Sequence, residues 1–436
     1  MSRKSPASCA NAGATREVAG LRILVLGAGV VGTTSAWYLA RAGHQVTVVD
    51  RQAQAGMETS FANGGQISVS HAEPWANPHV FSRLRQWLGR EDAPLLWRWR
   101  ADPAQLAWGL RFLGECRPGA TRRNIAAIVA LALYSRQQLG LLRDELALDY
   151  DQLVRGILHI YTDRQEFAAA SEAARTMRAY GVERETIDVD ACLQVEPALA
   201  DARHLLVGGD YTRSDESGDA HRFTRALAEH AAAAGVVFRY GLSIDKLAPG
   251  GRQLAGVVVH GPAGGELLTA DAYVVALGSY SPLLLRPLGL RMPVYPAKGY
   301  SATLPLADAV RAPSVSITDD ERKLVFSRLG NRLRIAGTAE FNGYNLDLNE
   351  VRCQALIQRT RQLFPRLEIA GPPEFWCGLR PATPSNRPLI GRTRYGNLWL
   401  NTGPGTLGWT MACGSAAALA DLIGGRPPAV EFPFLS

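Results

Sequence analysis

Short apolar runs and helical periodicities alternate at both ends of the chain, as is typical of an α/β fold. Residues 23–26 form an apolar strand, and the helix after it is ended by Gly43. A second strand over residues 45–49 leads directly into Asp50. Much later, residues 271–279 are almost continuously apolar up to a glycine and a serine, which indicates a strand in the centre of a parallel sheet.

The region after the first α/β unit is expected to be helical. Residues 75–150 read as helices, with Pro103 in a first turn and apolar periodicity over residues 122–146. Residues 156–162 then alternate like a strand, and Asp163 can cap the next helix. Five tryptophans here are interpreted as packing anchors: Trp75, Trp87, Trp97, Trp99 and Trp108.

Further along, the pattern predicts antiparallel pieces. Asp219 can cap an alanine-rich helix over residues 221–234, and a hairpin is expected from residues 254–260 with residues 266–269. Residues 293–338 contain several strand-like runs with turn residues between them. We expect these runs to form a separate antiparallel sheet.

The last part of the chain returns to mixed structure. An amphipathic helix near residues 350–364 is expected to cover the antiparallel sheet. Short strands follow from residue 375, and a glycine-rich turn over residues 403–408 precedes a helix of small residues over 409–423. A helix that begins behind a glycine turn is a second place where negative charge is favoured.

A Gly-x-Gly-x-x-Gly motif joins the first strand to the first helix. Gly27 permits the tight turn, Gly29 lets the backbone approach a pyrophosphate, and Gly32 lets the helix close onto the strand. Asp50, at the tip of the second strand, stands where a carboxylate would hold the two hydroxyls of a ribose. The motif therefore predicts a dinucleotide cradle. The alternative is a glycine turn in some other α/β unit.

Residues 58–67 are small, polar and rich in glycine, so they are poor core material. Backbone and amide side chains in such a segment can press against a flat ligand.

Composition narrows the class of protein. The 436 residues are 47% hydrophobic, enough for large cores in two or three lobes. We see no apolar run near the roughly 18 residues that span a bilayer, and expect a soluble or peripheral protein. Residues 1–20 lack an apolar segment, and are expected to be a disordered leader rather than a secretory signal.

The distribution of charge and of cysteines argues against a nucleic-acid-binding protein and against a metal-binding protein. The net charge is +7, but only four basic residues are lysines and no basic block alternates with aromatics, so we expect no nucleic-acid binding. Six cysteines are scattered without a CxxC or any metal-ligand spacing. This indicates a reducing compartment and predicts no metal site.

Several segments together resemble one family from about Leu21 to the C-terminus. They are the cradle, residues 58–68, the Pro-Ala-Lys-Gly-Tyr run at 296–300, Gly-Leu-Arg-Pro at 378–381, and the glycine turn with the helix start over 401–414. The chain resembles the bacterial D-amino acid dehydrogenases, a branch of the FAD-dependent amino-acid oxidoreductases. This resemblance, rather than spacing, is why FAD is favoured over NAD.

The resemblance implies a fold and a cofactor site. The fold is a Rossmann-type FAD-binding domain like that of glutathione reductase, built from residues 21–75, 200–290 and 370–436, with an α+β substrate domain over 76–199 and 291–369 whose antiparallel sheet roofs the flavin. The residues implied for FAD are Gly27, Gly29, Val30, Val31, Gly32, Asp50, Arg51, Ser60, Ala62, Asn63, Gly64, Gly65, Gln66, Gly278, Gly403, Gly405, Thr406, Leu407 and Gly408.

It also implies two catalytic residues. Arg380 would bind the substrate carboxylate through two parallel hydrogen bonds and so direct the Cα–H bond toward the flavin. The Tyr300 hydroxyl would share the carboxylate or seal the pocket, although a packed tyrosine with a satisfied hydroxyl fits as well. Lysine is rare in this chain, so Lys298 suggests a buried residue that supports the site. The default interpretation is a solvated lysine at the edge of a strand.

The implied reaction is oxidative deamination of a D-alanine-like amino acid to a 2-oxo acid and ammonia, by hydride transfer from Cα to flavin N5. Electrons would pass to a quinone or another acceptor, at a cytoplasmic location with possible peripheral contact to the inner membrane. Two alternatives stay open: oxidation of secondary amines such as glycine, sarcosine or D-proline, and a dinucleotide-binding protein without catalysis.

Two positions depart from the family pattern. Pro404 stands in the flavin-facing turn where the family usually has histidine, so one hydrogen-bond donor is missing. Cys377 stands where threonine is common; covalent attachment of the flavin is conceivable there, but a buried structural thiol is favoured.

Overall fold

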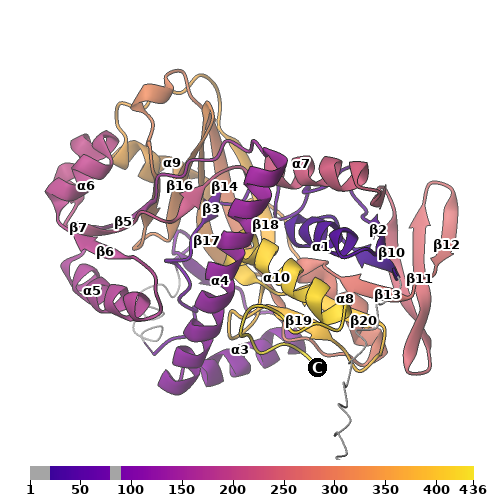
Figure 1. Cartoon of the computed structure of the whole chain (residues 1–436). Helices are drawn as coiled ribbons and strands as arrows, with labels where there is room; N and C mark the ends of the chain where they lie inside the picture. Colours follow the sequence, from indigo (N-terminus) through magenta and orange to yellow (C-terminus); the bar gives the residue numbers. More distant parts are fainter. Residues whose placement is uncertain (1–19, 79–89) are drawn as a thin grey trace, which may run out of the picture.

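The computed structural model describes residues 20–78 and 90–436. The predicted leader lies outside the described residues except for Gly20, and so does Trp87. Figure 1 shows one large sheet on the right of the molecule and a second in the centre and on the left, with long helices in front of the place where they meet.

The first sheet holds six strands within the described ranges, in the order β19-β20-β13-β1-β2-β9. All neighbours are parallel except β19 and β20. Its central strand β13 carries the apolar run predicted for such a place, and Val274 is fully buried there. The strands are β1 (Arg22–Leu26), β2 (Gln45–Val49), β9 (Val237–Arg239), β13 (Ala272–Val275), β19 (Leu389–Arg392) and β20 (Leu398–Thr402).

Each face of this sheet is covered. Helices α1 (Val30–Arg41), α7 (Ala220–Ala233) and α10 (Gly408–Ile423) pack on one face with the long helix α4 (Pro118–Leu146). The opposite face packs against an antiparallel sheet and the short helix α8 (Ser281–Leu285). That sheet consists of β10 (Ser243–Gly250), β11 (Gln253–Gly261) and β12 (Gly264–Leu268). The predicted hairpin is β11 with β12, and β10 adds a strand that the sequence did not indicate.

The second sheet holds nine strands in the part of the chain that is described, in the order β18-β14-β17-β16-β15-β5-β7-β6, with β4 beside β17. Helix α9 (Glu350–Leu363) covers one face, and the core between them is apolar. The strands are β4 (Leu95–Trp97), β5 (Ile157–Tyr161), β6 (Glu185–Ile187), β7 (Gly208–Thr212), β14 (Tyr295–Pro305), β15 (Ser316–Asp319), β16 (Leu324–Leu329), β17 (Arg332–Phe341) and β18 (Glu374–Ala382).

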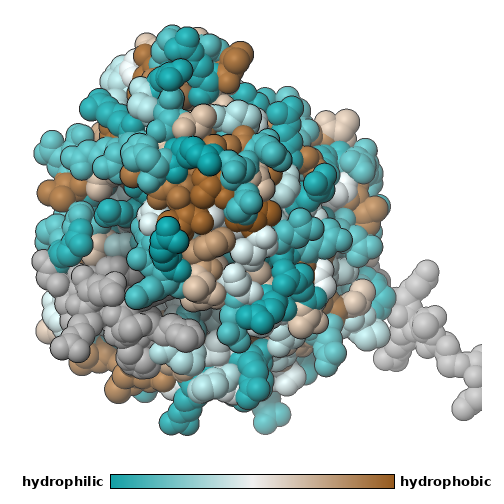
Figure 2. All heavy atoms as spheres, turned by 90° about the vertical axis from the view of Figure 1, so that its left-hand side faces the viewer, coloured by the Kyte–Doolittle hydropathy of each residue, from teal (hydrophilic) through white to brown (hydrophobic). Residues whose placement is uncertain are grey.

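The remaining elements lie outside these three sheets. They are β3 (Gln66–Ile67) with β8 (Glu216–Ser217), α3 (Pro103–Glu115), α5 (Arg164–Ala179), α6 (Val189–Val195) and the 3₁₀ turns η1 (Pro197–Leu205), η2 (Gly278–Tyr280), η3 (Arg286–Leu288), η4 (Ala309–Arg311) and η5 (Gly405–Leu407). Helices α5 and α6 lie at one end of the molecule. That end is mostly hydrophilic in Figure 2, with one compact hydrophobic group near its middle.

Two features differ from the sequence predictions. The helical prediction for residues 75–150 is wrong over the described residues 75–78 and 90–102, where β4 joins the second sheet instead. Aromatic and apolar residues there pair with β17, and this tertiary partner outweighs local propensity. Strands β7 and β18 lie in the second sheet, although their residues were assigned to the cofactor domain. The division into domains otherwise stays a prediction.

Two helices, spanning Pro118–Leu146 and Gly405–Ile423, are long and apolar enough by length and composition to cross a membrane. This differs from the expectation that the chain has no apolar run of that length. The second helix, which includes α10, has 78% of its most apolar window buried, between α1 and α4. A core helix passes the same test, so the finding is weak evidence for a span.

Candidate active site

A cavity of about 1190 Å³ lies between the two sheets. One arm runs past the carboxyl ends of β1 and β2, where a parallel sheet places its ligands. A second arm is apolar and reaches α3, and a third is polar and reaches β5. Of the predicted site residues, all but Gly32 and Gly403 line this cavity.

The glycine motif forms the tight turn that the sequence predicts. Gly27 has φ +106°, and a Cβ there would lie 2.8 Å from the carbonyl oxygen of Ala276. A Cβ at Gly32 would lie 1.8 Å from the carbonyl oxygen of Gly27, so this glycine lets α1 close onto β1 and never reaches the cavity. The first turn of α1 opens into the cavity through Gly29 and Val30.

Asp50 and Arg51 stand at the end of β2. The two Asp50 carboxylate oxygens accept N–H bonds from Ala28 (2.6 Å) and Gln52 (2.8 Å), which leaves each oxygen a further lone pair. Burial raises the pKa of Asp50. The Arg51 guanidinium stacks 4.3 Å above the Tyr280 ring. Asp50 therefore shapes the turn, and only its remaining lone pairs can reach a ribose.

The segment 60–66 forms one wall of the cavity. The Ser60 hydroxyl accepts the N–H of Val30 at 3.1 Å, and thus caps the first turn of α1. Gln66 donates to the hydroxyls of Ser316 (2.9 Å) and Thr318 (3.0 Å), and so ties this wall to β15. The segment is thus fixed to α1 at one end and to the second sheet at the other, which gives a flat ligand a rigid wall.

The glycine turn before α10 forms the opposite wall. Gly405 and Gly408 line the cavity with the residues between them, so α10 points its N-terminus into the space. Gly278 also reaches the cavity, whereas Gly403 packs against Thr383, where a Cβ would lie 2.9 Å from that side chain. The two helices α1 and α10 thus aim their positive ends at one cavity.

Arg380 lies on the face of the second sheet that meets the cavity. Its guanidinium donates to the backbone carbonyls of Thr338 (2.6 Å) and Gly337 (3.3 Å), and no carboxylate in residues 20–78 or 90–436 pairs with it. It lies flat across Gly299, where a Cβ would be 2.3 Å from the Arg380 Cζ atom. Burial, with a smaller effect of the Arg352 charge, lowers the pKa of Arg380 to about 10. The result is an enclosed positive charge for which the described part of the chain supplies no counter-ion.

Tyr300 is also among the residues that line the cavity, but its side chain projects from the other face of the sheet. In the β14–β18 register Arg380 stands opposite Ala297, three residues from Tyr300, so the two side chains project from opposite faces. The Tyr300 ring packs in the core under α9, and its hydroxyl donates to the Glu340 carboxylate. This geometry matches the packed tyrosine with a satisfied hydroxyl, and leaves no hydroxyl for the substrate.

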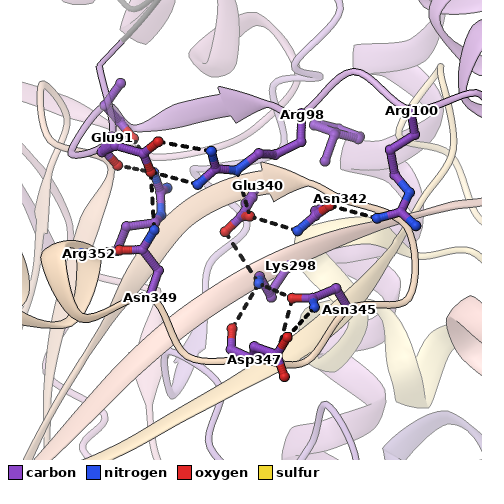
Figure 3. Close-up of polar contacts among 12 residues, drawn as sticks. Glu91, Arg98, Arg100, Lys298, Glu340, Asn342, Asn345, Asp347, Asn349 and Arg352 are labelled. Atoms are coloured by element: carbon purple, nitrogen blue, oxygen red, sulfur yellow. Dashed lines mark hydrogen bonds and ion pairs between the residues drawn. The ribbon is translucent and has the colours of Figure 1, made fainter.

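Lys298 belongs to the same buried group, and Figure 3 shows its contacts with Glu340, Asn345 and Asp347. Its ammonium lies 3.4 Å from the Glu340 carboxylate, and donates to Asn345 at 2.9 Å. Burial alone would raise the pKa of Glu340. The hydrogen bond from the Tyr300 hydroxyl and the positive charges of Lys298 and Arg352 have the larger effect, so the pKa of Glu340 is lowered. Lys298 is thus a buried supporting residue and not a solvated edge lysine.

The chain is similar to known proteins over nearly its whole length. The family model described as DAO, FAD dependent oxidoreductase, matches residues 22–422. The chain belongs to the FAD-dependent oxidoreductase family. It is 78% identical over 416 residues to a D-amino acid dehydrogenase of Dechloromonas aromatica, covering 95% of this chain and 100% of that protein. It is 55% identical to a D-amino acid dehydrogenase of Paramagnetospirillum magneticum, over 94% of this chain and 97% of that one.

Solved structures share the fold of this FAD-dependent oxidoreductase. Glycine oxidase from Geobacillus kaustophilus aligns with a TM-score of 0.73 at 20% identity, over 95% of this chain and 97% of that one. L-proline dehydrogenase from P. horikoshii aligns with a TM-score of 0.72 at 17% identity, over 94% of both chains. The predicted α/β fold and the predicted cofactor class are confirmed.

The cavity of this oxidoreductase fits FAD. A Cβ at Gly27 would clash with the carbonyl oxygen of Ala276, and a Cβ at Gly29 would lie 3.8 Å from the Ser60 hydroxyl. The two glycines therefore leave the backbone of the cradle accessible to a ligand. The predicted donors from α1, segment 60–66 and η5 all face one continuous space. The same space is lined by Asp50 at one place and by the start of α10 at another, as binding of an extended dinucleotide requires. The individual contacts to FAD stay predictions.

The two departures from the family pattern lie at the cavity wall. Pro404 lines the cavity and offers no N–H donor there. The Cys377 thiol lies 3.0 Å from the backbone carbonyl oxygen of Leu346, and burial raises its pKa. A thiol held in its neutral form is a poor nucleophile, so the geometry favours the structural role.

The polar arm was not predicted from the sequence. His71, His159 and Asp320 offer ligand atoms within 4.8 Å of one another. Asp320 already holds the Nδ1 atom of His159 at 2.6 Å and the Lys323 ammonium at 2.8 Å. These residues are far apart in sequence, so no spacing could have shown the cluster. The neighbouring ammonium disfavours a cation, and the expectation of no metal stays a prediction.

Proposed function

We propose that this chain oxidises D-amino acids with small, uncharged side chains, such as D-alanine. The observation that carries the proposal is the Arg380 guanidinium, which is enclosed at the cavity wall without a carboxylate partner in the described residues. A substrate carboxylate would supply that partner through two parallel hydrogen bonds. In the overall reaction, amino acid, water and an oxidised acceptor yield a 2-oxo acid, ammonia and the reduced acceptor.

Arg380, helix α10, bound FAD and an aromatic wall would each have a separate role in this reaction. Arg380 binds and orients the substrate carboxylate, and α10 directs the positive end of its dipole into the same space. Bound FAD would supply the redox chemistry, taking up the two electrons that leave the substrate. The wall formed by Trp97, Trp108 and Phe341, with ring centroids 4.8–6.2 Å apart, suits an apolar side chain.

Anaerobic absorbance of the FAD-loaded protein tests the proposal. D-Alanine is expected to bleach the oxidised-flavin spectrum, and L-alanine is not. Arg380→Ala should keep FAD but slow bleaching at least 100-fold, whereas Arg252→Ala, on an exposed loop, should bleach like the wild type. Bleaching of Arg380→Ala at the wild-type rate would reject the carboxylate role.

Oxidation of a secondary amine is the second candidate. Glycine oxidase and L-proline dehydrogenase share the fold, but at 20% and 17% identity they support no more than that. Sarcosine and D-proline belong in the same experiment for this reason. Bleaching by these compounds alone would replace our proposal with this one.

We also propose a membrane quinone as the electron acceptor, with the protein on the cytoplasmic face of the inner membrane. The apolar arm of the cavity opens beside exposed apolar side chains on and next to α3: Trp99 (77% exposed), Leu106 (51%), Leu110 (72%) and Leu113 (48%). Exposed arginines flank them at positions 111, 117, 122 and 123. Apolar residues beside basic ones are typical of a surface that binds anionic lipid.

Vesicle sedimentation tests this second part. Leu110→Gln should reduce binding to vesicles of anionic phospholipid, and slow electron transfer to an incorporated quinone. Leu141→Gln is the matched control, because Leu141 is 58% exposed on α4 and does not line the cavity. Equal binding of both variants would exclude α3 as the docking face.

A further inference from the structure

The ladder between β14 and β17 is interrupted beside Arg380. Lys298 pairs with Glu340 and Tyr300 pairs with Gly337, so two residues of β17, Thr338 and Ala339, stand opposite one. This is a β-bulge. Its first residue, Thr338, has φ +54°, in the left-handed region. Glycine is the usual residue there, and a β-branched side chain is a genuine outlier.

The bulge holds the guanidinium of Arg380. Successive carbonyls of a regular strand point to opposite sides, but those of Gly337 and Thr338 both accept from this one side chain. The Thr338 N–H donates in turn to the carbonyl of Lys323 at 3.2 Å. The positive φ therefore has a structural purpose that glycine would serve without strain.

The threonine side chain needs a separate explanation. Its Oγ1 atom is buried and has no hydrogen-bond partner in the described residues. Thr338 lines the cavity with Gly337 and Ala339, on the side of the sheet from which Arg380 projects. Leaving a buried hydroxyl unsatisfied is unfavourable, and keeping it at a strained position adds to that cost. Strain of this kind gathers at ligand sites.

We infer that Thr338 is a substrate-binding residue whose hydroxyl donates to the carboxylate held by Arg380. This inference rests on the proposed function. A carboxylate has about four lone-pair sites, and the guanidinium fork uses two of them, so a third donor beside the fork has an acceptor. Binding would satisfy the hydroxyl, and would place three donors around one carboxylate.

Three variants separate the hydroxyl from the backbone. Thr338→Ala removes the hydroxyl and keeps the Cβ atom, Thr338→Gly removes both and suits the positive φ, and Thr338→Ser keeps the hydroxyl as the matched control. Calorimetric titration of the FAD-loaded proteins with propionate, which is D-alanine without its amine, measures carboxylate binding without turnover. Steady-state kinetics with D-alanine supplies KM and kcat, and thermal unfolding reports the fold.

We expect the alanine and glycine variants to weaken propionate binding about tenfold, and to raise KM similarly, with kcat within threefold of wild type. Thr338→Ser should stay within threefold on all three measures. Because glycine tolerates the backbone conformation, Thr338→Gly should fold even if Thr338→Ala does not.

Three results would overturn the inference. Unchanged propionate binding and KM in the glycine variant would exclude the hydroxyl. Equal losses in all three variants would assign the effect to backbone shape. A raised KM with unchanged propionate binding would move the contact to the amine. Wild-type protein that binds propionate without oxidising D-alanine would instead overturn the proposed function alone.

Discussion

The proposed substrate clamp, Arg380, depends on a missing side chain as much as on a present one. Arg380 can lie flat because Gly299 leaves its space free, and two backbone carbonyls fix it there. The sequence named Arg380 through a resemblance, and Gly299 only as part of the same motif. The sequence could not show from which face of the sheet the Tyr300 side chain projects, because that depends on which residues of β14 and β18 pair.

Gly299→Ala should therefore disable the clamp although Arg380 itself is unchanged. The new Cβ would come within 2.3 Å of the Arg380 guanidinium and displace it. We expect KM for D-alanine to rise at least tenfold while FAD stays bound, as measured by steady-state kinetics and flavin absorbance. Gly371→Ala is the control, since its Cβ would meet only Pro305, at 3.4 Å. Similar KM values in both variants would contradict the role of Gly299.

His71 gives the protein a pH-dependent stability. Burial lowers its pKa to about 3, so between that value and the ordinary 6.5 the unfolded chain binds the extra proton. Stability should thus fall as the pH drops from 6.5, by at most about 1.4 kcal/mol per pH unit from this residue. Urea unfolding at pH 7 and pH 5 should show a smaller loss for His71→Gln than for wild type. An equal loss would assign the effect to other histidines.

At the scale of single elements, local signals predicted well. Asp163 and Asp219 cap α5 and α7 as the sequence indicated, because a cap needs only side-chain and backbone atoms of neighbouring residues. Strand β4 and the third strand β10 were missed, since both are stabilised by partners distant in sequence. Locally encoded features are readable from the chain, and partner-dependent ones are not.

The two caps should differ in strength. Asp163 is exposed and caps α5 alone, so Asp163→Ala should cost about 1 kcal/mol. Asp219 is 4% exposed, caps α7 and also pairs with Arg332 at 2.9 Å. Its replacement by alanine should cost about 2 kcal/mol or more, because it removes both interactions. Urea unfolding measures both, and equal costs would show that the Arg332 pair contributes nothing.

At the scale of the whole molecule, the cavity separates two sheets that the cofactor would bridge. Removing FAD should lower the stability by about 2.7 kcal/mol relative to protein with free FAD at 100 times its dissociation constant. Thermal unfolding with and without FAD measures the difference. ADP should stabilise less, because it reaches only the arm near Asp50. No stabilisation by FAD would contradict the cofactor assignment.

The sequence could predict the kinds of structure at this scale, but not the pairing of the segments. The resemblance predicts a cofactor domain and a substrate domain. Strands β7 and β18, whose residues it assigns to the cofactor domain, lie in the second sheet. Such assignments depend on contacts between residues hundreds of positions apart, which periodicity does not encode.

The strand order of the first sheet also constrains how the protein is made. Strand β1 pairs with β13, where Leu24 stands opposite Tyr273, a residue that is synthesised much later. Strand β13 in turn pairs with β20, where Tyr273 stands opposite Leu398. On the ribosome β1 can pair with β2 soon after synthesis, but its other edge stays unpaired and apolar until β13 is made. Completion of the cradle therefore comes late in translation. Nascent chains are expected to need holdase chaperones until then, and prematurely terminated chains should be cleared rather than loaded with cofactor.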